Sequence, residues 1–262
     1  MQFFFSEFKA DYEHYDFPYQ VFAKLEFGDD LTRIYASGLL PTRHKKGIFY
    51  LARSTRVKLS NFSLTSENRR IMGKVSDLNL EIKPVENFEY NLEVQRFCAL
   101  STRALGKGKA VFSTDQIKKM FAGETNVTHI ATYRKSDGQV AGYACIVVTG
   151  SLCHYAYPFG EANSDNQNLN IGMMTMAVNW AYNQHKQYIY LGTSYTQGSL
   201  YKAQFNNFEF FTGWKWSMNL DQLKGLIERD NHHLISDKEF VAEKFESENV
   251  FEEISTVRVR YK

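Results

Sequence analysis

A β-hairpin followed by a third strand constrains the fold of this chain more than any other feature. Residues 128–133 are rich in β-branched and aromatic residues and lead into the turn Ser136-Asp137-Gly138, after which residues 139–148 continue as a long strand. Residues 152–158 predict the next strand of an antiparallel meander. A meander in the middle of the chain predicts a central sheet whose faces are covered by other elements.

The elements around the meander indicate which fold it belongs to. A helix is expected near Glu86 and a second one from Ser113 through Met120. After the meander, residues 170–185 predict a helix buried on more than one side, which leads into a strand at residues 188–192. This order is that of the GNAT acyltransferase fold. We therefore expect an α+β fold in which helices flank a mixed, largely antiparallel sheet.

Residues 1–80 are expected to form a smaller N-terminal α/β subdomain. Asp29-Asp30 predicts the start of a helix that ends before Gly38, and residues 47–52 and 55–59 predict two strands paired with each other. A further helix begins near Thr65. Residues 81–262 are expected to form the GNAT-like catalytic domain. Its tail, from Asp221 onward, carries charges of both signs, and residues 255–262 alternate like a strand.

Charge and cysteine content exclude several classes of protein. A net charge of +2 is too small for a strongly basic nucleic-acid binder, so RNA contacts are expected only from local patches such as Lys107-Gly108-Lys109 and Lys118-Lys119. The three cysteines contain no C-x-x-C pair, which argues against a disulfide framework or a structural zinc site and favours a reducing cytoplasm. No apolar run approaches the ~20 residues of a membrane span, and the first residues lack the pattern of a signal peptide.

A tyrosine-rich strand with a following lysine carries the most specific sequence pattern. Tyr188-Ile189-Tyr190-Leu191-Gly192 is followed after a short polar loop by Tyr201-Lys202 and Phe205. This pattern resembles a segment of the arginyl- and leucyl-tRNA:protein transferases. Three further stretches are similar to that family, and together with the first they cover most of residues 45–217: the aromatic strand 154–158, the helix start 170–174, and the basic strand 56–58 with the helix that contains Ser66 to Arg70.

The resemblance implies an enzyme that transfers arginine or leucine from charged tRNA to the N-terminal amine of an acceptor protein, which creates a degradation signal. It implies no cofactor, with aminoacyl-tRNA as co-substrate, and the partners are then aminoacyl-tRNA and protein N-termini. Members of the family usually carry a cysteine cluster just before the basic strand. Here residues 50–56 contain no cysteine, so we expect no metal there, and the identity of the acceptor stays open.

Transfer to an amine by aminolysis requires a neutral amine, donors for the developing oxyanion and a route for the lost proton. We expect Tyr190, Lys202 and His154 to be catalytic, with Lys202 holding a phosphate or stabilising the oxyanion and His154 acting as general base. The residues expected to bind substrate or tRNA are Arg53, Arg56, Arg69, Arg70, Tyr155, Tyr157, Tyr195, Tyr201 and Phe205. The alternative is structural: strand aromatics pack a core, and arginines and lysines are solvated.

Two other functions are compatible with the same fold. An acetyl-CoA-dependent N-acetyltransferase would hold the pyrophosphate in a glycine-rich loop at the start of the central helix. Residues 167–174 offer only Gly172 for such a loop, which favours aminoacyl-tRNA as the donor. The second alternative is a module that binds protein N-termini without catalysis, whose signature would be peptide binding without turnover.

Overall fold

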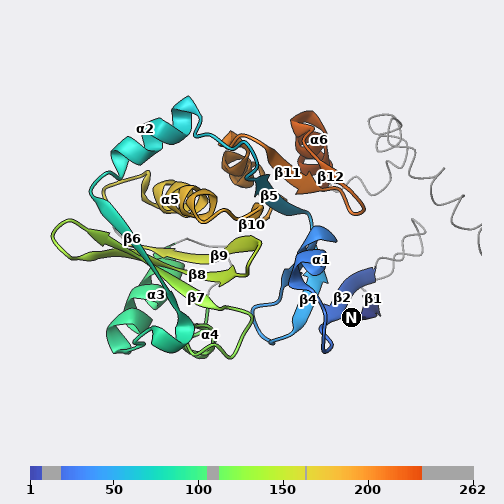
Figure 1. Ribbon diagram of the computed structural model, residues 1–262, viewed down its shortest axis with the longest axis horizontal. Helices are drawn as coiled ribbons and strands as arrows, with labels where there is room; N and C mark the ends of the chain where they lie inside the picture. The colour runs from blue at the N-terminus through green and yellow to red at the C-terminus, as the bar shows by residue number, and fades with distance from the viewer. Residues whose placement is uncertain (8–18, 105–111, 163, 232–262) are drawn as a thin grey trace, which may run out of the picture.

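The computed structural model describes residues 1–7, 19–104, 112–162 and 164–231, which form two sheets and flanking helices (Figure 1). The smaller sheet has the order β1-β2-β4-β3, and the larger one β12-β11-β5-β10-β9-β8-β7-β6. The smaller sheet contains β1 (Gln2–Glu7), β2 (Tyr19–Lys24), β3 (Leu39–Pro41) and β4 (Ile48–Leu51). The larger sheet contains β5 (Ser54–Lys58), β6 (Leu78–Pro84), β7 (His129–Lys135), β8 (Val140–Val148), β9 (Leu152–Gly160), β10 (Tyr188–Thr193), β11 (Phe208–Phe211) and β12 (Trp216–Ser217).

The helices begin where polar side chains satisfy the first free backbone amides. Asp30, Thr65 and Ser113 are the N-caps of α1, α2 and α4, and each accepts a hydrogen bond from a backbone N–H of the first turn. The sequence predicts all three of these starts. The α-helices are α1 (Leu31–Ala36), α2 (Ser66–Lys74), α3 (Leu92–Ala104), α4 (Thr114–Phe121), α5 (Leu169–Asn183) and α6 (Leu220–Asn231), and the 3₁₀ helices are η1 (Val85–Asn87) and η2 (Gln197–Gln204).

The predicted meander is confirmed: β7, β8 and β9 pair antiparallel in succession. The chain then crosses through α5 and returns as β10, which pairs with β9 in parallel. All other pairs of the large sheet are antiparallel. The expected α+β class with GNAT-like element order is therefore correct. The division at residue 80 stays a prediction, although β5 from the first section hydrogen bonds with β10 and β11 of the second.

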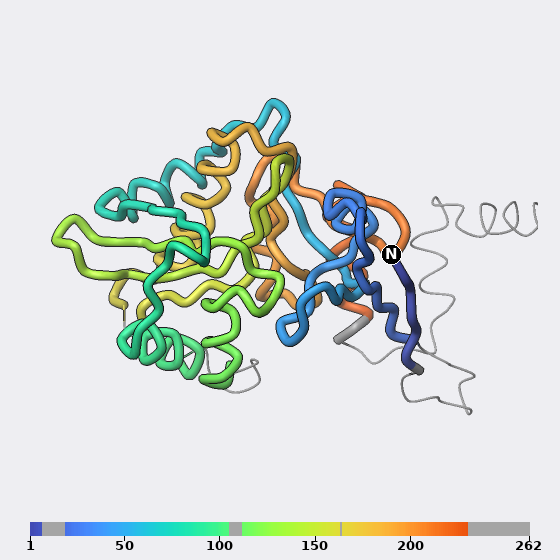
Figure 2. The backbone as a smooth tube through the Cα atoms, turned by 60° about the horizontal axis from the view of Figure 1, so that its bottom comes forward, coloured from blue at the N-terminus to red at the C-terminus, as the bar shows by residue number. Residues whose placement is uncertain are grey.

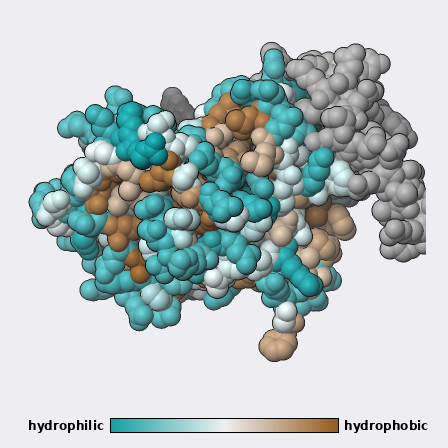
Figure 3. All heavy atoms as spheres, turned by 45° about the horizontal axis from the view of Figure 1, so that its top comes forward, coloured by the Kyte–Doolittle hydropathy of each residue, from teal (hydrophilic) through white to brown (hydrophobic). Residues whose placement is uncertain are grey.

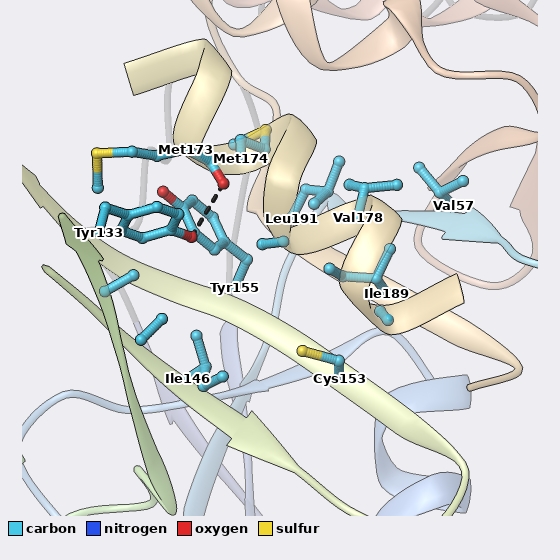
Figure 4. Close-up of a cluster of buried hydrophobic side chains, with 14 of the residues drawn as sticks. Val57, Tyr133, Ile146, Cys153, Tyr155, Met173, Met174, Val178, Ile189 and Leu191 are labelled. Atoms are coloured by element: carbon cyan, nitrogen blue, oxygen red, sulfur yellow. Dashed lines mark hydrogen bonds between the residues drawn. The ribbon is translucent and has the colours of Figure 1, made fainter. Parts of the chain in front are cut away.

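Helices cover both faces of the large sheet, α2 and α5 on one and α3 and α4 on the other (Figure 1). Successive side chains of a strand point to opposite faces. On β8, Ala144 and Ile146 accordingly lie in the cluster beneath α5, whereas Tyr143 and Cys145 lie in the cluster beneath α3 and α4. Figure 4 shows the first cluster, in which the Tyr133 hydroxyl donates a hydrogen bond to the carbonyl of Met173 on α5. The burial of α5 on several sides, expected from the sequence, follows from this position.

The small sheet packs against the ends of the central strands, through a cluster that contains α1 and residues of both sheets. Tyr35 of α1 is fully buried there beside Tyr190 of β10, with ring centroids 4.8 Å apart. The Trp216 indole N–H also donates to the carbonyl of Ala36 at 2.7 Å, which ties β12 to the same helix. Figure 2 shows the blue N-terminal section at one end of the molecule, where an orange segment from late in the chain also passes. Residues far apart in sequence therefore form one wall of the molecule.

One expectation for the first section is wrong. Residues 47–52 and 55–59 were expected to pair, but β4 and β5 lie in different sheets. A tight turn at Ala52-Arg53 redirects the chain after β4. The next strand, β5, is a central strand of the large sheet and is buried along nearly its whole length.

The start of the charged tail forms α6, since Leu223 and Ile227, four positions apart, pack on Phe208 and Phe210. The expected strand at 255–262 and Lys107 to Lys109 lie outside the described residues.

The surface is mainly hydrophilic on the face shown in Figure 3, where apolar side chains gather in separate patches. None of the helices in the described ranges combines the length and the apolar character needed to cross a membrane. Most of the large apolar side chains described are instead buried in the clusters on the two faces of the sheet and between the two sheets.

Gly172 allows α5 to lie close to the end of α2. A Cβ at this position would overlap with Cγ1 of Val75. We expect Gly172→Ala to lower the free energy of unfolding by about 1–3 kcal/mol, because the two elements must separate to admit the methyl group. Urea unfolding measures the effect. The same substitution in a Val75→Ala background should cost clearly less, and an equal cost in both backgrounds would contradict the proposed contact.

Candidate functional site

The two parallel strands at the centre of the large sheet separate after a short common stretch. Leu152, Cys153 and His154 of β9 stand opposite Tyr188, Ile189 and Tyr190 of β10. Beyond these residues β9 continues along β8, while β10 continues only along β5. The ladder of β8 and β9 shifts register between Cys145 and Ile146, so that Ala156 has no partner in the pairing. The shift turns β9 away from β10 and opens a gap between them.

A cavity of about 950 Å³ occupies the region where the strands separate. Its walls come from the ends of β9 and β10, from η2 and from the small sheet with the loop after β3. The residues of the two separating strands that line it are His154, Tyr155, Ala156, Tyr157, Pro158, Leu191, Gly192 and Thr193. Gly192 has a φ of +80°, a conformation that few side chains tolerate, at the point where β10 leaves β9. The cavity thus depends on a glycine and a bulge.

Lys202 of η2 brings a buried cation to the cavity wall. Its side chain is 9% exposed, and its Nζ donates a hydrogen bond to the carbonyl of Thr193 at 2.7 Å. Within the described residues it forms no salt bridge with a carboxylate. Burial lowers the pKa of the Lys202 amine to about 8, because the charged form loses solvation. A substantial fraction of Lys202 is therefore neutral at slightly alkaline pH.

His154 lies on the same wall and is 4% exposed. A hydrogen bond of 3.0 Å joins its Nδ1 to the Tyr35 hydroxyl. Burial, followed by the charge of Lys202, lowers the pKa of His154 to about 3. The imidazole is then neutral at pH 7, but a group with so acidic a conjugate acid accepts a proton weakly. Its role as general base stays a prediction that the electrostatics do not favour.

The tyrosines expected from the sequence share the cavity with Lys202. Tyr155, Tyr157, Tyr195 and Tyr201 all line the cavity. Burial raises the pKa of the Tyr155, Tyr157 and Tyr201 phenols, which keeps them protonated and able to donate hydrogen bonds. The Tyr195 hydroxyl accepts a hydrogen bond from the backbone N–H of Arg53 at 2.8 Å. The structure therefore brings six of the expected site residues together around one cavity.

Tyr190 and Phe205 lie beside the cavity but do not line it. Tyr190 is 1% exposed and packs against Tyr35 and Trp216, while Phe205 belongs to the core beneath α5. The hydroxyl of Tyr190 accepts a hydrogen bond from Arg56 at 3.4 Å. Both side chains hold the strand and η2 in place, which is the structural alternative that the sequence left open for strand aromatics.

The four expected arginines are not part of the cavity lining. Arg56 forms a buried ion pair with Glu209, whose Oε2 lies 2.6 Å from its Nε, and Arg53 lies over the ring of Tyr195 at 4.8 Å. Arg69 and Arg70 are exposed on α2, where Arg70 pairs with Glu67 at 2.7 Å. Because α2 packs on α5, these two charges stand on a different surface from the cavity.

Several lining residues escaped the sequence reasoning. The cavity is also lined by Tyr50, Leu51, Phe112, Arg43 and His44. The run Arg43-His44-Lys45-Lys46 is the one local signal that could have drawn attention to this part of the lining. No sequence pattern around Tyr50 or Phe112 predicts that they line a cavity. Both reach it only because the small sheet and the segment that contains α4 pack against β9.

The fold and the cavity define a GNAT-like α+β protein with a site where the central strands separate. No family model and no curated protein match the chain. L-PGS from Bacillus licheniformis matches 63% of this chain and 51% of its own, at 12% identity and a TM-score of 0.43. A second match is the C-terminal DUF2156 domain of a protein from Agrobacterium fabrum that is named as a lysylphosphatidylglycerol synthetase. The match covers 63% of this chain and 51% of that chain, at 13% identity and a TM-score of 0.42.

A third solved structure is the GCN5-related glucosamine N-acetyltransferase region of a fungal multi-domain GH3 β-N-acetylglucosaminidase. It matches 72% of this chain and 23% of its own at 11% identity, with a TM-score of 0.41. The match therefore spans about half of the first two proteins and about a quarter of the third. Within the described residues no group of three or more His, Cys, Asp or Glu side chains could hold a metal ion.

Proposed function

We propose that this chain transfers an amino acid, arginine or leucine, from charged tRNA to the N-terminal amine of an acceptor protein. The observation that carries the proposal is the buried Lys202, which forms no described ion pair and stands among protonated tyrosines where β9 and β10 separate. Such a site provides a group that can transfer a proton and several hydrogen-bond donors in a confined space. Aminolysis of an ester requires both. Leu191 and Gly192 at the end of the tyrosine-rich strand, together with Tyr201 and Lys202, line this same cavity, and they belong to the pattern that resembles the aminoacyl-tRNA:protein transferases.

The reaction requires the acceptor's ammonium group to lose a proton before attack. An α-amine has an ordinary pKa of about 7.7–8.0, which is close to the value of about 8 for Lys202. Lys202 accepts this proton, and the neutral nitrogen attacks the ester carbonyl of the aminoacyl group. A C–N bond forms and the C–O bond to the ribose breaks. Of the two protons that the acceptor nitrogen loses in becoming an amide, one passes through Lys202 to the ribose oxygen and the other is released to water. While protonated, Lys202 also stabilises the negative charge on the carbonyl oxygen.

Backbone and phenol donors support the same step. Ala156 lies at the register shift of β9 and lines the cavity, so its amide is our candidate for a second donor to the oxyanion. Tyr157 contributes a protonated phenol, whose pKa burial raises, and its hydroxyl also reaches the carbonyl of Pro41 at 3.4 Å. These groups are held by strands and need little rearrangement, which favours stabilisation of a transition state.

The acetyl-CoA alternative lacks support at the start of α5. A pyrophosphate site there needs glycines so that the backbone can approach the anion. Gly172 instead gives room to Val75, and the Asn170 side chain packs against Gly160. We therefore expect no saturable binding of acetyl-CoA at micromolar concentration in calorimetry. Saturable binding that charged tRNA leaves unchanged would contradict the proposal.

The direct test uses labelled arginyl-tRNA and leucyl-tRNA with peptides that begin with Asp, Glu, Arg or Lys. We expect the label to pass to the N-terminus of at least one peptide. Absence of label in every combination would reject the transfer reaction on these substrates. Binding of a peptide without any turnover would instead support the N-terminus-binding module.

A further inference from the structure

The loop between β3 and β4 places consecutive basic residues at the rim of the cavity. Arg43 and His44 line the cavity, and Lys45 and Lys46 follow them on the exposed surface. We refer to residues 42–46 as the cationic loop. Arg69 and Arg70 on α2, which the sequence suggested for tRNA contacts, have no part in this rim.

The cationic loop is fixed to α4 and the segment after it. The Gln116 amide donates to Nδ1 of His44 at 2.9 Å, and Nζ of Lys46 donates to the carbonyl of Gly123 at 3.1 Å. Asn126 accepts a hydrogen bond from the N–H of Gly47 at 2.9 Å and donates one to the carbonyl of Lys45 at 3.2 Å. These contacts hold the positive charges in one place before any ligand arrives, which lowers the entropy cost of binding.

No carboxylate among the described residues forms an ion pair with the cationic loop. In the described part of the chain, no salt bridge involves Arg43, Lys45 or Lys46. The Arg43 guanidinium lies 5.1 Å from the ring centre of Phe112, which in turn meets Tyr157 edge-on at 5.5 Å. Cations and aromatic rings that alternate along the entrance to a cavity are suited to single-stranded nucleic acid, because the cations bind the phosphates and the rings stack on the unpaired bases.

We propose that the cationic loop binds the sugar–phosphate backbone at the acceptor end of the tRNA and guides its single-stranded 3′ terminus past Arg43 and Phe112 into the cavity. This inference rests on the proposed function. Arg43, Lys45 and Lys46 contact phosphates, and Phe112 and Tyr157 offer ring faces to the terminal bases. Arg43 and Phe112 line the same cavity as Lys202, so a 3′ terminus that passes them brings its terminal ester into the cavity that holds Lys202.

The test compares two triple variants by fluorescence anisotropy with deacylated tRNA over a range of salt concentrations. Arg43→Gln/Lys45→Gln/Lys46→Gln removes three charges from the cationic loop, and Arg69→Gln/Arg70→Gln/Lys74→Gln removes three from α2. We expect the loop variant to bind at least 10-fold more weakly near 100 mM salt, with a salt slope reduced by roughly 0.7–0.9 for each phosphate that the variant no longer neutralises. The α2 variant should stay within about twofold of the wild type.

Equal loss in both variants, no loss in either, or absence of tRNA binding by the wild type would overturn the inference. Because Lys46 also fastens the loop, the double variant Arg43→Gln/Lys45→Gln keeps that hydrogen bond and must still lose affinity. Vesicles containing phosphatidylglycerol form a separate arm. Binding to these vesicles that depends on the loop, without binding to tRNA, would assign the charges to a membrane surface and reject the RNA proposal.

The inference and the proposed function fail in different ways. If peptides are labelled but the loop variant keeps the wild-type KM for aminoacyl-tRNA, the docking surface is wrong and the transfer reaction stands. If tRNA binding depends on the loop but no peptide is ever labelled, the surface stands and the transfer reaction is wrong.

Discussion

Lys202→Met is expected to lower the single-turnover rate of aminoacyl transfer by about 100-fold or more, the lower end of what a positioned acid or base contributes. Methionine preserves the length of the side chain but can neither accept the acceptor's proton nor stabilise the oxyanion. The rate is measured with saturating labelled aminoacyl-tRNA and peptide. Lys83→Met, which makes the same change at a half-exposed lysine of β6, should leave the rate unaltered.

The pH dependence provides a sharper test of the role of Lys202. In the reactive state the acceptor amine is neutral, because it must attack, and Lys202 is an ammonium, because it has accepted the amine's proton. The two groups together therefore carry one ionisable proton. With a pKa of about 8 for Lys202, the wild-type rate should pass through a maximum near pH 8. The variant should show a much lower rate that only rises with pH to a plateau, as the free amine accumulates. A maximum retained in Lys202→Met, or a rate within threefold of the wild type, would reject the role.

The same variant should not be less stable at neutral pH. Burial holds the pKa of Lys202 near 8, below its ordinary 10.5, so the unfolded chain binds more protons between these two pH values. This residue's contribution to stability therefore rises with pH across that window, and below it the buried charge opposes folding by up to about 3 kcal/mol. Lys202→Met removes this buried charge and so gains stability. It also loses the hydrogen bond to the Thr193 carbonyl, which offsets part of that gain. Urea unfolding at pH 7 thus separates a loss of chemistry from a loss of structure.

Glu209→Ala is expected to lower the free energy of unfolding by about 3–5 kcal/mol, because it leaves the Arg56 guanidinium buried without a counter-charge. The side chains of Arg56 and Glu209 are 8% and 15% exposed, and the guanidinium lies between the rings of Tyr188 and Trp216, at 4.0 and 3.9 Å from their centres. Urea unfolding at pH 7 measures the loss. The double variant Arg56→Met/Glu209→Ala should recover a large part of it, since both charges are then absent.

Glu67→Ala is the matched control for Glu209→Ala. It removes the partner of Arg70 from an exposed pair, in which the side chains are 48% and 52% exposed. Solvent screens such a pair, so the cost should stay below about 1 kcal/mol. If the two alanine variants are equally destabilising, the Arg56–Glu209 pair does not hold β5 between β10 and β11 as the structure indicates.

The local elements of this protein were predictable from particular residues. The turn at Ser136 to Gly138 and the caps at Thr65 and Ser113 act over a few positions, and each reappears in the structure. The gap between β9 and β10 follows from the GNAT-like order, and it brings Lys202, His154 and four expected tyrosines to one cavity. Helix α3 begins at Leu92, later than the predicted start near Glu86, because the Asn91 side chain accepts hydrogen bonds from the first free backbone amides there.

The sequence by itself determined the meander, the helix caps and the tyrosine-rich strand with its lysine, because periodicity, turn chemistry and capping depend on residues close together in the chain. Only the tertiary structure decided that β4 and β5 belong to different sheets and that Arg56 is neutralised by Glu209, more than 150 positions away. It also decided that the cationic loop, rather than α2, borders the cavity. These outcomes depend on which surfaces meet when the two sheets pack, and no short-range pattern encodes the burial and the charge pairing that result.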